Sequence, residues 1–285
     1  MAYTTINKST DYFNTKIYTS TGNDNLAITG VGFEADLTWI KKARIVSGSN
    51  TNEAHYWVDQ VRGYNKWIAS SSTGAESTST NDLKSWQSDG FTLGTDNKVN
   101  QGSSAHIYAA YNWKANGQGS SNTDGSINTT YTSVNTTAGF SISKYTGTGS
   151  NATVGHGLGS VPKMIIVKRL SGGTGEWGVY HASLGNTKAL YLNGTSASST
   201  ETAFWNSTSP TSSVFSVGTA NDTNGSGSTY IAYCFAEKTG YSKFGSYTGN
   251  GNSNGSFIYT GFKPAFIMRK RYDGGTNHWS IMNNK

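Results

Sequence analysis

The stretch YIAYCF at residues 230–235 decides the fold class of this chain of 285 residues. An apolar, aromatic run of this length, bounded by Gly, Ser and Thr, is typical of a β-strand. A similar stretch, YAAYNW, occupies residues 108–113. Each follows an Asn- and Gly-rich loop, and each loop follows a short segment that ends in Gly-Thr, at residues 214–219 and 90–95. One block of sequence therefore occurs twice.

A second block precedes this one and occurs three times. An aromatic residue and a Tyr-Thr pair lead to a Gly-containing turn and then to an apolar run that ends in Lys. The three copies span residues 13–42, 140–169 and 244–271. Only the first two copies are followed by a counterpart of residues 230–235. Repetition of this kind indicates recurring structural units.

Tryptophans follow the Lys at the end of these runs. The interval from Lys168 to Trp177 equals that from Lys270 to Trp279, and we expect Trp57 to play the same part in the first copy after a longer loop. Aromatic residues at matching positions are best explained as core, so we expect these three indoles to be buried.

The hydrophobic patterns predict an all-β fold. Residues 164–167 and 266–268 are continuous apolar runs, as expected for strands covered on both faces, whereas residues 90–95 alternate, as expected for a strand with one wet face. Short strands separated by turn residues favour antiparallel β-sandwiches. We therefore predict tandem β-sandwich units, lectin-like or jelly-roll-like, with long polar loops.

The repeats also predict the domain organisation. We expect an N-terminal arm (1–11), a first sandwich (12–115), a linker rich in Gly, Ser, Asn and Thr (116–139), a second sandwich (140–238) and a partial third repeat (239–285). A partial repeat cannot bury its own apolar face. It is expected either to complete the second sandwich or to form an interface.

Composition excludes several classes of protein. With 35 Gly, 13% charged and 13% aromatic residues, the chain is neither a typical helical enzyme nor a disordered segment. The net charge of +6 is scattered apart from residues 269–271, which argues against nucleic-acid binding. No apolar run could span a membrane and the first residues lack the apolar core of a signal peptide, so we expect synthesis in a cytoplasm without membrane insertion. The single Cys234 is expected to be buried, because it lies within an apolar strand.

The motifs resemble an uncharacterised tandem-repeat β domain of structural proteins (fibre, decoration or tail) from marine tailed bacteriophages, especially cyanophage-like ones. The resemblance covers nearly the whole chain, including the opening TTINKSTDYF at residues 4–13. The first copy departs from the pattern, with Ala35 where Pro162 and Pro264 stand and with Ser20 in place of a Gly. The resemblance implies a virion protein acting in assembly or surface display. Its implied partners are capsid or tail proteins and further copies of itself, with a trimer expected by analogy with fibres, and it carries over no catalytic residues.

Docking surfaces are expected at the two ends of the chain, where apolar residues lack enough chain to bury them. The residues concerned are Tyr3, Ile6, Tyr12, Phe266, Met268 and Trp279.

A glycan-binding module for host attachment is the main alternative function. It would use Trp67, Trp86 and Trp205, which lie among polar loop residues and have no counterparts in the other copies. Packing beneath a long loop is the competing explanation for each of them.

A polysaccharide depolymerase is a weaker alternative. It would need two carboxylates facing one cleft, and the candidates Glu53, Asp59, Glu176 and Glu201 do not recur at matched positions. We therefore predict no enzymatic activity.

The sequence predicts no cofactor and no metal. The five His residues lack metal-ligand spacing. The Asn/Asp loops at residues 96–100 and 221–224 are expected to be hairpin turns, with a Ca²⁺ site as the alternative, since each loop has one carboxylate. Lys41, Lys168 and Lys270 are expected to be solvated strand ends, with ligand binding as their alternative.

Overall fold

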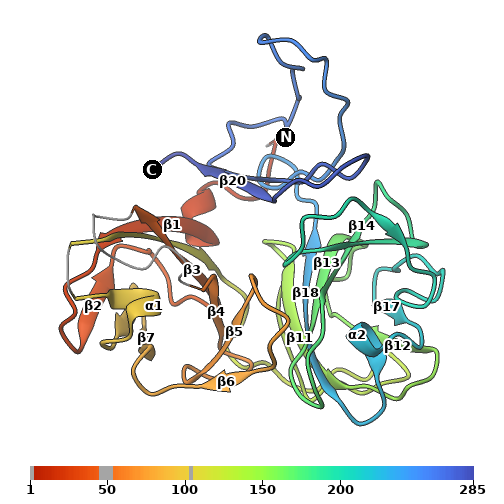
Figure 1. Ribbon diagram of the computed structural model, residues 1–285, viewed down its shortest axis with the longest axis horizontal. Coiled ribbons are helices and arrows are strands. Elements are labelled where there is room, and N and C mark those ends of the chain that lie inside the picture. The colour runs from red at the N-terminus through yellow and green to blue at the C-terminus, as the bar shows by residue number, and fades with distance from the viewer. Residues whose placement is uncertain (1–2, 45–53, 103–104) are drawn as a thin grey trace.

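Antiparallel strands make up almost all of the regular structure in the computed structural model, which describes residues 3–44, 54–102 and 105–285. The predicted all-β sandwich fold is confirmed. Two units lie side by side, and a C-terminal hairpin lies above both (Figure 1). We call strands β1–β9 the first unit, strands β10–β18 the second unit, and residues 239–285 the third segment.

Each unit combines a large sheet with a small one. The first large sheet has the order β1 (Phe13–Thr19), β9 (Ile107–Trp113), β3 (Leu37–Arg44), β4 (Tyr56–Asp59), β5 (Lys66–Ala69) and β6 (Ser77–Thr78). Its small sheet has the order β2 (Leu26–Thr29), β8 (Gly90–Leu93) and β7 (Leu83–Gln87).

The second unit has a similar plan, but its large sheet has one strand more, at the edge, and its small sheet has one strand fewer. Its large sheet has the order β10 (Tyr131–Asn135), β11 (Phe140–Thr146), β18 (Thr229–Ala236), β13 (Pro162–Arg169), β14 (Trp177–His181), β15 (Lys188–Tyr191) and β16 (Ser199–Thr200). The small sheet pairs β12 (Ala152–Gly155) with β17 (Val214–Val217). Strand β10 lies within the predicted linker 116–139, so that prediction was wrong for this part: residues 131–135 are buried or partly buried and pair along the whole of β10 with β11.

Three short helical segments and one more hairpin complete the structure. They are η1 (Ser9–Asp11), α1 (Asn97–Asn100), α2 (Asn221–Asn224), and the hairpin of β19 (Phe266–Arg269) with β20 (Ser280–Asn283). None of the described helices has the length and apolar character needed to cross a bilayer.

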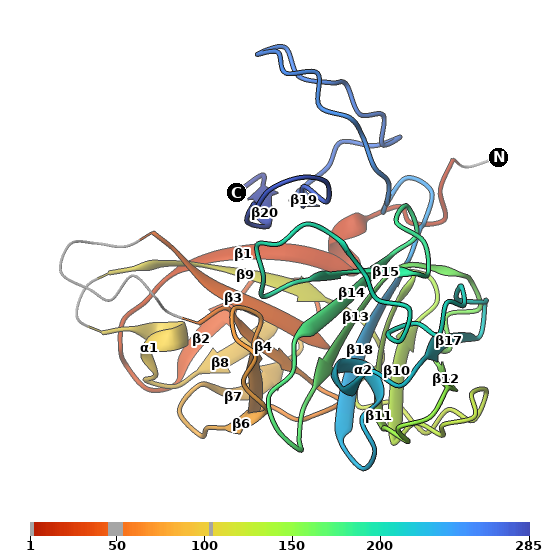
Figure 2. The same ribbon diagram turned by 45° about the vertical axis from the view of Figure 1, so that its right-hand side comes forward.

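The large sheets are apolar on both faces. In β13, Ile165 and Val167 face the small sheet of their own unit, whereas Ile166 faces a central cluster between the two large sheets. This alternation explains the continuous apolar run, because each side chain meets a buried surface. The order of layers is therefore small sheet, large sheet, large sheet, small sheet, as the turned view of Figure 2 illustrates.

A polar motif closes one end of each sandwich. In the second unit, the rings of Tyr145 and Tyr230 stack with centroids 5.3 Å apart, and the Tyr145 hydroxyl donates to the Thr223 carbonyl at 2.6 Å. The buried Asn224 side chain donates to the Gly218 carbonyl at 2.7 Å and accepts from the Thr148 N–H at 2.8 Å. The side-chain amide thus replaces backbone partners that the turn would otherwise lack.

The first unit repeats this motif. Tyr18 and Tyr108 stack at 5.3 Å, Tyr18 donates to the Val99 carbonyl at 2.7 Å, and the Asn100 amide donates to Gly94 at 2.8 Å. The two Asn/Asp loops thus contain the helical turns α1 and α2, and the prediction of simple hairpin turns was wrong. A buried Asn at the end of each helix organises the loop.

Candidate functional site: the central interface and the C-terminal hairpin

Large aromatic side chains join the two units. The Trp57 ring lies 5.3 Å from Trp177 and 5.0 Å from Tyr233, measured between centroids, and both pairs are T-shaped. At the other end of the interface, Trp113 contacts Phe140 and Phe235 of the second unit at 6.4 and 6.3 Å. Edge-to-face packing of this kind adds to the stabilisation from burial.

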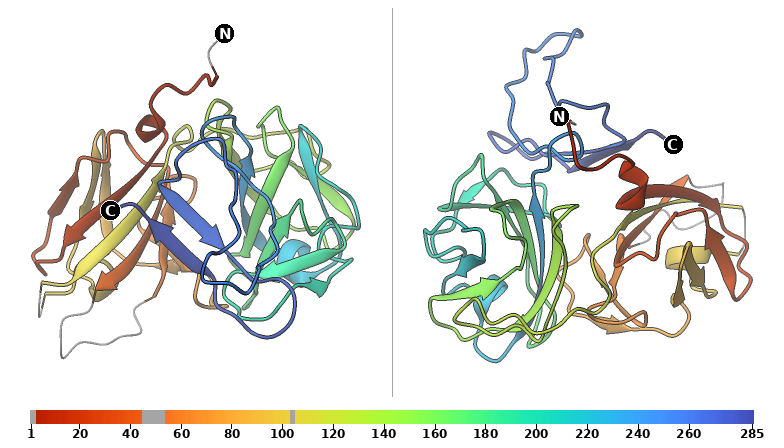
Figure 3. Two further views of the ribbon diagram at one scale, coloured as in Figure 1. Left: turned by 90° about the horizontal axis from the view of Figure 1, so that it is seen from above. Right: turned by 180° about the vertical axis from the view of Figure 1, so that it is seen from behind.

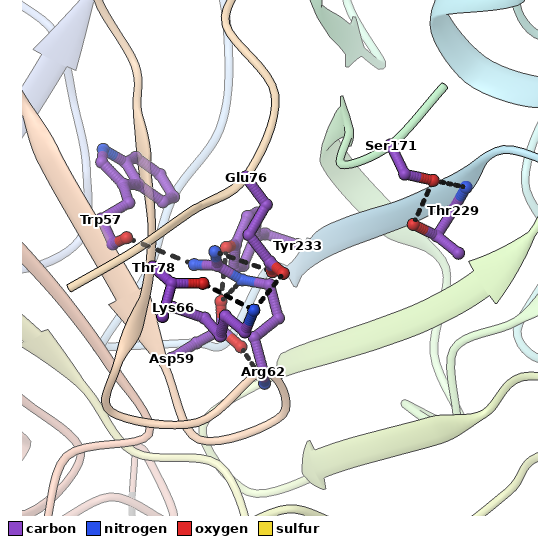
Figure 4. A network of polar contacts seen from close by, with 9 residues as sticks. All are labelled: Trp57, Asp59, Arg62, Lys66, Glu76, Thr78, Ser171, Thr229 and Tyr233. Atoms are coloured by element: carbon purple, nitrogen blue, oxygen red, sulfur yellow. Dashed lines mark hydrogen bonds and ion pairs between the residues drawn. The ribbon is translucent and has the colours of Figure 1, made fainter. Parts of the chain in front are cut away.

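A buried ionic network crosses the same interface (Figure 4). Arg62 Nε lies 2.6 Å from Asp59 Oδ2, and both side chains are fully buried. Tyr233 of the second unit donates its hydroxyl proton to the same Asp59 oxygen at 2.7 Å. Arg62 also donates to the Trp57 carbonyl and lies 3.5 Å from Glu76. The network therefore links β4 and the loop after it to β18.

Burial and the charged groups of this network shift the pKa values of Arg62 and Tyr233. Burial by itself would lower the pKa of Arg62, but the nearby negative charges, Asp59 first among them, raise that pKa above its ordinary value. Burial and the Asp59 carboxylate raise the pKa of Tyr233 well above its ordinary value. Arg62 thus stays charged and Tyr233 stays protonated. Asp59, one of the carboxylates considered for catalysis, is bound to both of them and has a structural role.

Lys168 is buried rather than solvated. Its ammonium donates to the carbonyl of Thr73 in the first unit at 2.9 Å and to that of Gly175 at 2.8 Å. Burial lowers its pKa from 10.5 to about 8. The expectation of a solvated strand end was wrong here, because residues 69–73 of the first unit cover the end of β13. The indole of Trp177 donates to two carbonyls of that loop, those of Ala69 and Ser72.

The third segment contacts the second unit through the same kinds of bond. The Lys270 ammonium donates to the carbonyl of Thr195 at 2.7 Å, and the Trp279 indole donates to that of Tyr191 at 2.9 Å. The Thr195 carbonyl also accepts a hydrogen bond from the backbone N–H of Asn277 at 2.8 Å. The third segment therefore lies on the second unit much as the second lies on the first.

The tryptophans do not all have the predicted role. Trp177 pairs with Lys168, but Trp57 pairs with Trp39, which stands two residues before Lys41. Trp57 thus lies two residues along its hairpin from the position that corresponds to Trp177, and its assignment to that position was wrong. Because the loop before Trp57 is longer than its counterpart in the second copy, counting residues along the sequence does not give the register of this hairpin. Trp57 and Trp177 are nevertheless buried in the central cluster, as expected, whereas Trp279 is only partly buried against it.

The C-terminal hairpin packs on both units instead of completing the second sandwich. Phe266 contacts Phe13, Tyr111 and Trp113 at 5.3, 5.2 and 5.8 Å. Asn283 donates to the Tyr111 hydroxyl at 3.0 Å. Figure 3 shows the hairpin crossing the boundary between the units.

The predicted docking residues fall into two groups. Phe266, Met268 and Trp279 pack against the central cluster within the chain. Of the arm residues, Ile6 is buried and Tyr12 contacts the ring of Tyr241 at 6.3 Å. Tyr3 is 61% exposed and, with residues of the third segment, lines a hollow of about 110 Å³.

Exposed apolar side chains are concentrated beside that arm. In the third segment they are Tyr247, Phe257, Ile258, Tyr259, Ile267, Tyr272 and Met282. Phe257 is 87% exposed and Tyr259 73% exposed. A concentration of exposed apolar residues in one region is typical of an interaction surface.

The three loop tryptophans do not come together in one site. Trp205 is 1% exposed and donates to the Lys188 carbonyl, so packing beneath a loop describes it correctly and the glycan-binding alternative was wrong for this residue. Its loop folds back over the second core. Trp67 and Trp86 belong to the first unit and are partly buried against its core.

Beside Trp67 lies a charged cluster that the sequence did not single out. Lys98 Nζ is 4.7 Å from the Trp67 ring, 3.4 Å from Asp82 and 2.7 Å from Asp96. Burial and Asp96 raise the pKa of Asp82 to about 6, while hydrogen bonds from Lys98 lower the pKa of Asp96 despite its own burial. Such a difference in pKa can serve acid–base chemistry. Here Lys98 binds both carboxylates and Asp96 caps α1, which accounts for the arrangement as a support of that loop.

The other carboxylates considered for catalysis do not gather around a common cleft. Glu176 accepts from Asn193, and Glu201 accepts from the Tyr191 hydroxyl at 2.8 Å. Glu53 lies outside the described residues. Within the described ranges, no group of three or more His, Cys, Asp or Glu side chains is arranged to hold a metal ion. Cys234 is buried, as expected.

Of the comparisons with known proteins, only the one with protein families gave a match. No match was found to a curated protein or to a solved structure. Residues 8–285 match a family described as a domain of unknown function, DUF7483, and this match covers both units and the third segment. The chain belongs to the DUF7483 family.

Proposed function

We propose that the chain is a non-enzymatic tandem-repeat protein of a tailed-phage particle that acts in assembly or surface display. The observation that carries the proposal is the third segment, where exposed apolar side chains surround a hairpin that is anchored on both units. A folded chain with one region of exposed apolar side chains is suited to docking on another protein. The resemblance of the repeated motifs to phage structural proteins supports the placement in a virion.

Particle purification tests this proposal. The chain should co-sediment with particles through a density gradient at a fixed ratio to the capsid protein, and antibodies should label one place on each particle. Recovery of the chain only in the soluble fraction of infected cells would overturn the virion role. Localisation of the label also decides between head and tail.

Host-glycan binding is the second candidate. It is favoured by Trp67 and Trp86, whose indoles remain partly exposed in the same unit. A glycan array with the intact chain and with Trp86→Ala tests it, because a sugar that stacks on this ring should lose binding in the variant. Release of reducing ends from host polysaccharide by the pure chain would instead indicate a depolymerase.

A further inference from the structure

The charged side chains are unevenly divided among the parts of the chain. Residues 1–115 contain ten basic and ten acidic residues, and residues 116–238 contain six basic and five acidic residues. The third segment contains six basic residues and one acidic residue, so it carries +5 of the net charge of +6. The basic residues are spread along the sequence, but the excess of positive charge lies in one region. Such a region attracts a partner of the opposite charge.

Some of these basic side chains are already bonded within the chain, and others are not. Lys243 and Arg271 form ion pairs with acidic neighbours at 2.7 and 3.4 Å, and Lys270 donates to two backbone carbonyls. Lys263 and Arg269 are exposed, and within the ranges that the structure describes they form no ion pair. Their charges are therefore available to another molecule.

The outer face of the β19–β20 hairpin combines one of these charges with apolar surface. Phe266 and Met268 pack against the central cluster. Because side chains alternate along a strand, Ile267 and Arg269 lie on the opposite face of β19, where both are exposed. Ile267 pairs directly with Met282, and these two side chains are 41% and 43% exposed. An aliphatic pair thus lies beside an unpaired guanidinium group.

A loop beside the hairpin adds aromatic surface. Its residues 257–259, Phe-Ile-Tyr, are 87%, 46% and 73% exposed. Figures 1 and 2 show the loop extending beyond the hairpin, away from both units. Aromatic residues, Met and Arg are the residue types that are enriched where proteins bind one another. The third segment therefore has the composition of a protein-binding surface as well as a positive charge.

We propose that the outer face of the β19–β20 hairpin and residues 257–259 bind an acidic surface of a different protein, with carboxylates opposite Lys263 and Arg269. The inference rests on the proposed assembly function and names the chemistry of the partner for it. Burial of the apolar side chains supplies most of the affinity. The opposite charges speed association and fix the orientation of the partner.

A second copy of this chain does not supply the acidic surface. Two third segments placed face to face would repel each other, since each carries a charge of +5. Neither of the other parts has an excess of acidic residues, because residues 1–115 have a net charge of zero and residues 116–238 have a net charge of +1. The charge that complements the third segment therefore comes from another polypeptide.

Nucleic acids and anionic membranes match this surface less well. A nucleic acid presents a phosphate at every nucleotide but little aliphatic surface, so Ile267 and Met282 would gain few contacts from it. A membrane surface is flat, whereas the loop extends beyond the hairpin, so the two elements would not reach it together (Figure 2). The surface of a protein can follow both elements.

Binding of synthetic polymers to the intact chain tests the chemistry of the partner. The probe is a random copolymer of Glu and Tyr, and the comparisons are polyglutamate of the same length, oligothymidylate and phosphatidylglycerol vesicles. We expect the copolymer to bind at least about fivefold more tightly than each comparison, because it alone offers carboxylates together with aromatic side chains. Its binding should weaken about tenfold when the NaCl concentration is raised from about 50 to about 300 mM.

Charge reversal locates the site on the chain. Lys263→Glu combined with Arg269→Glu should weaken binding of the copolymer at least about tenfold. The matched control combines Lys114→Glu with Lys188→Glu, which make the same change of charge at exposed positions of the two units. The control should have little effect on binding.

The apolar part of the surface is tested separately. Phe257→Ser should weaken binding of the copolymer about fivefold, because an exposed aromatic contact is lost. Tyr64→Ser, at an exposed aromatic residue of the first unit, is the control and should leave binding unchanged. Both positions are exposed, so the melting temperatures of the two variants should equal that of the wild type.

Binding of the copolymer that is no tighter than that of any one comparison would overturn the proposal, and so would equal losses in the two charge-reversal variants. Self-association of the chain that the copolymer blocks would identify a second copy as the occupant and overturn it as well. Copolymer binding by a chain that is absent from particles would sustain this inference and overturn the virion role alone. A chain that is present in particles but does not bind the copolymer at about 100 µM would overturn this inference alone.

Discussion

The Tyr233 hydroxyl of the second unit donates to the Asp59 carboxylate of the first at 2.7 Å, within a fully buried network that also holds Arg62. Asn283 and Tyr111 form the related bond between the third segment and the first unit. The units are thus joined by hydrogen bonds at matching positions as well as by apolar contact. The stability of the interface should depend on these few polar groups.

Tyr233→Phe should lower the free energy of unfolding by about 1–3 kcal/mol, because Asp59 loses a partner where water cannot replace it. Denaturant unfolding measures the change. Tyr180→Phe is a suitable control, since the Tyr180 ring is also buried but lies outside the central cluster. Equal losses in the two variants would contradict a special role for the Tyr233 hydroxyl.

Asp59→Ala should cost more, about 3–5 kcal/mol, because it leaves the Arg62 charge buried without its main counter-ion. The matched control is Asp24→Ala, which removes an exposed ion pair with Lys84 of similar length, 2.7 Å. That control should leave the free energy of unfolding almost unchanged, because the exposed pair is screened by water. A small loss in Asp59→Ala would show that water or another group compensates for the missing carboxylate.

The lowered pKa of Lys168 predicts how the free energy of unfolding depends on pH. Its folded pKa of about 8 lies below the unfolded value of 10.5, so between these values the unfolded chain binds more protons. Stability from this group therefore rises as the pH increases from 8 toward 10. The wild type, compared with Lys168→Met by denaturant titration at several pH values, should show this extra upward slope. A parallel pair of curves would contradict the buried, partly desolvated ammonium.

Asn224→Ala should destabilise the second unit by at least about 2 kcal/mol, because the Thr148 N–H and the Gly218 carbonyl both lose their partner. Asn100→Ala should have a similar effect on the first unit, where Asn100 bonds to Gly94 and Gly22. Asn252→Ala, in an exposed turn of the third segment, is the control and should be nearly neutral. Protease resistance of each unit locates the damage.

Local patterns predicted the strands, and long-range contacts account for what they missed. The continuous apolar run before Lys168 correctly indicated a strand covered on both faces. The same prediction was wrong for residues 266–268, where Ile267 is 41% exposed. The burial of Lys168 depends on residues 69–73, which are distant in sequence and have no pattern that marks them as a cover. The register of Trp57 depends on a hairpin whose loop length differs from that of its counterpart.

The candidate site was predicted in part. The apolar character of Phe266 and Met268 indicated an interface, but pairing within the chain was needed to show that both contact the central cluster. The strand-like sequence around Tyr247 gave no sign that it would remain unpaired. That property follows from the order of strands in the sheets, where the middle strand joins its two neighbours.

Cross-linking of intact particles followed by mass spectrometry tests the central claim most directly. Lys243 and Lys263 lie in the third segment, so an assembly role predicts reproducible cross-links from these residues to a second virion protein. Reference cross-links from Lys84, on the small sheet of the first unit, should be fewer. Particles in which the chain is absent, or in which Lys243 and Lys263 link only to residues of their own chain, would contradict the account.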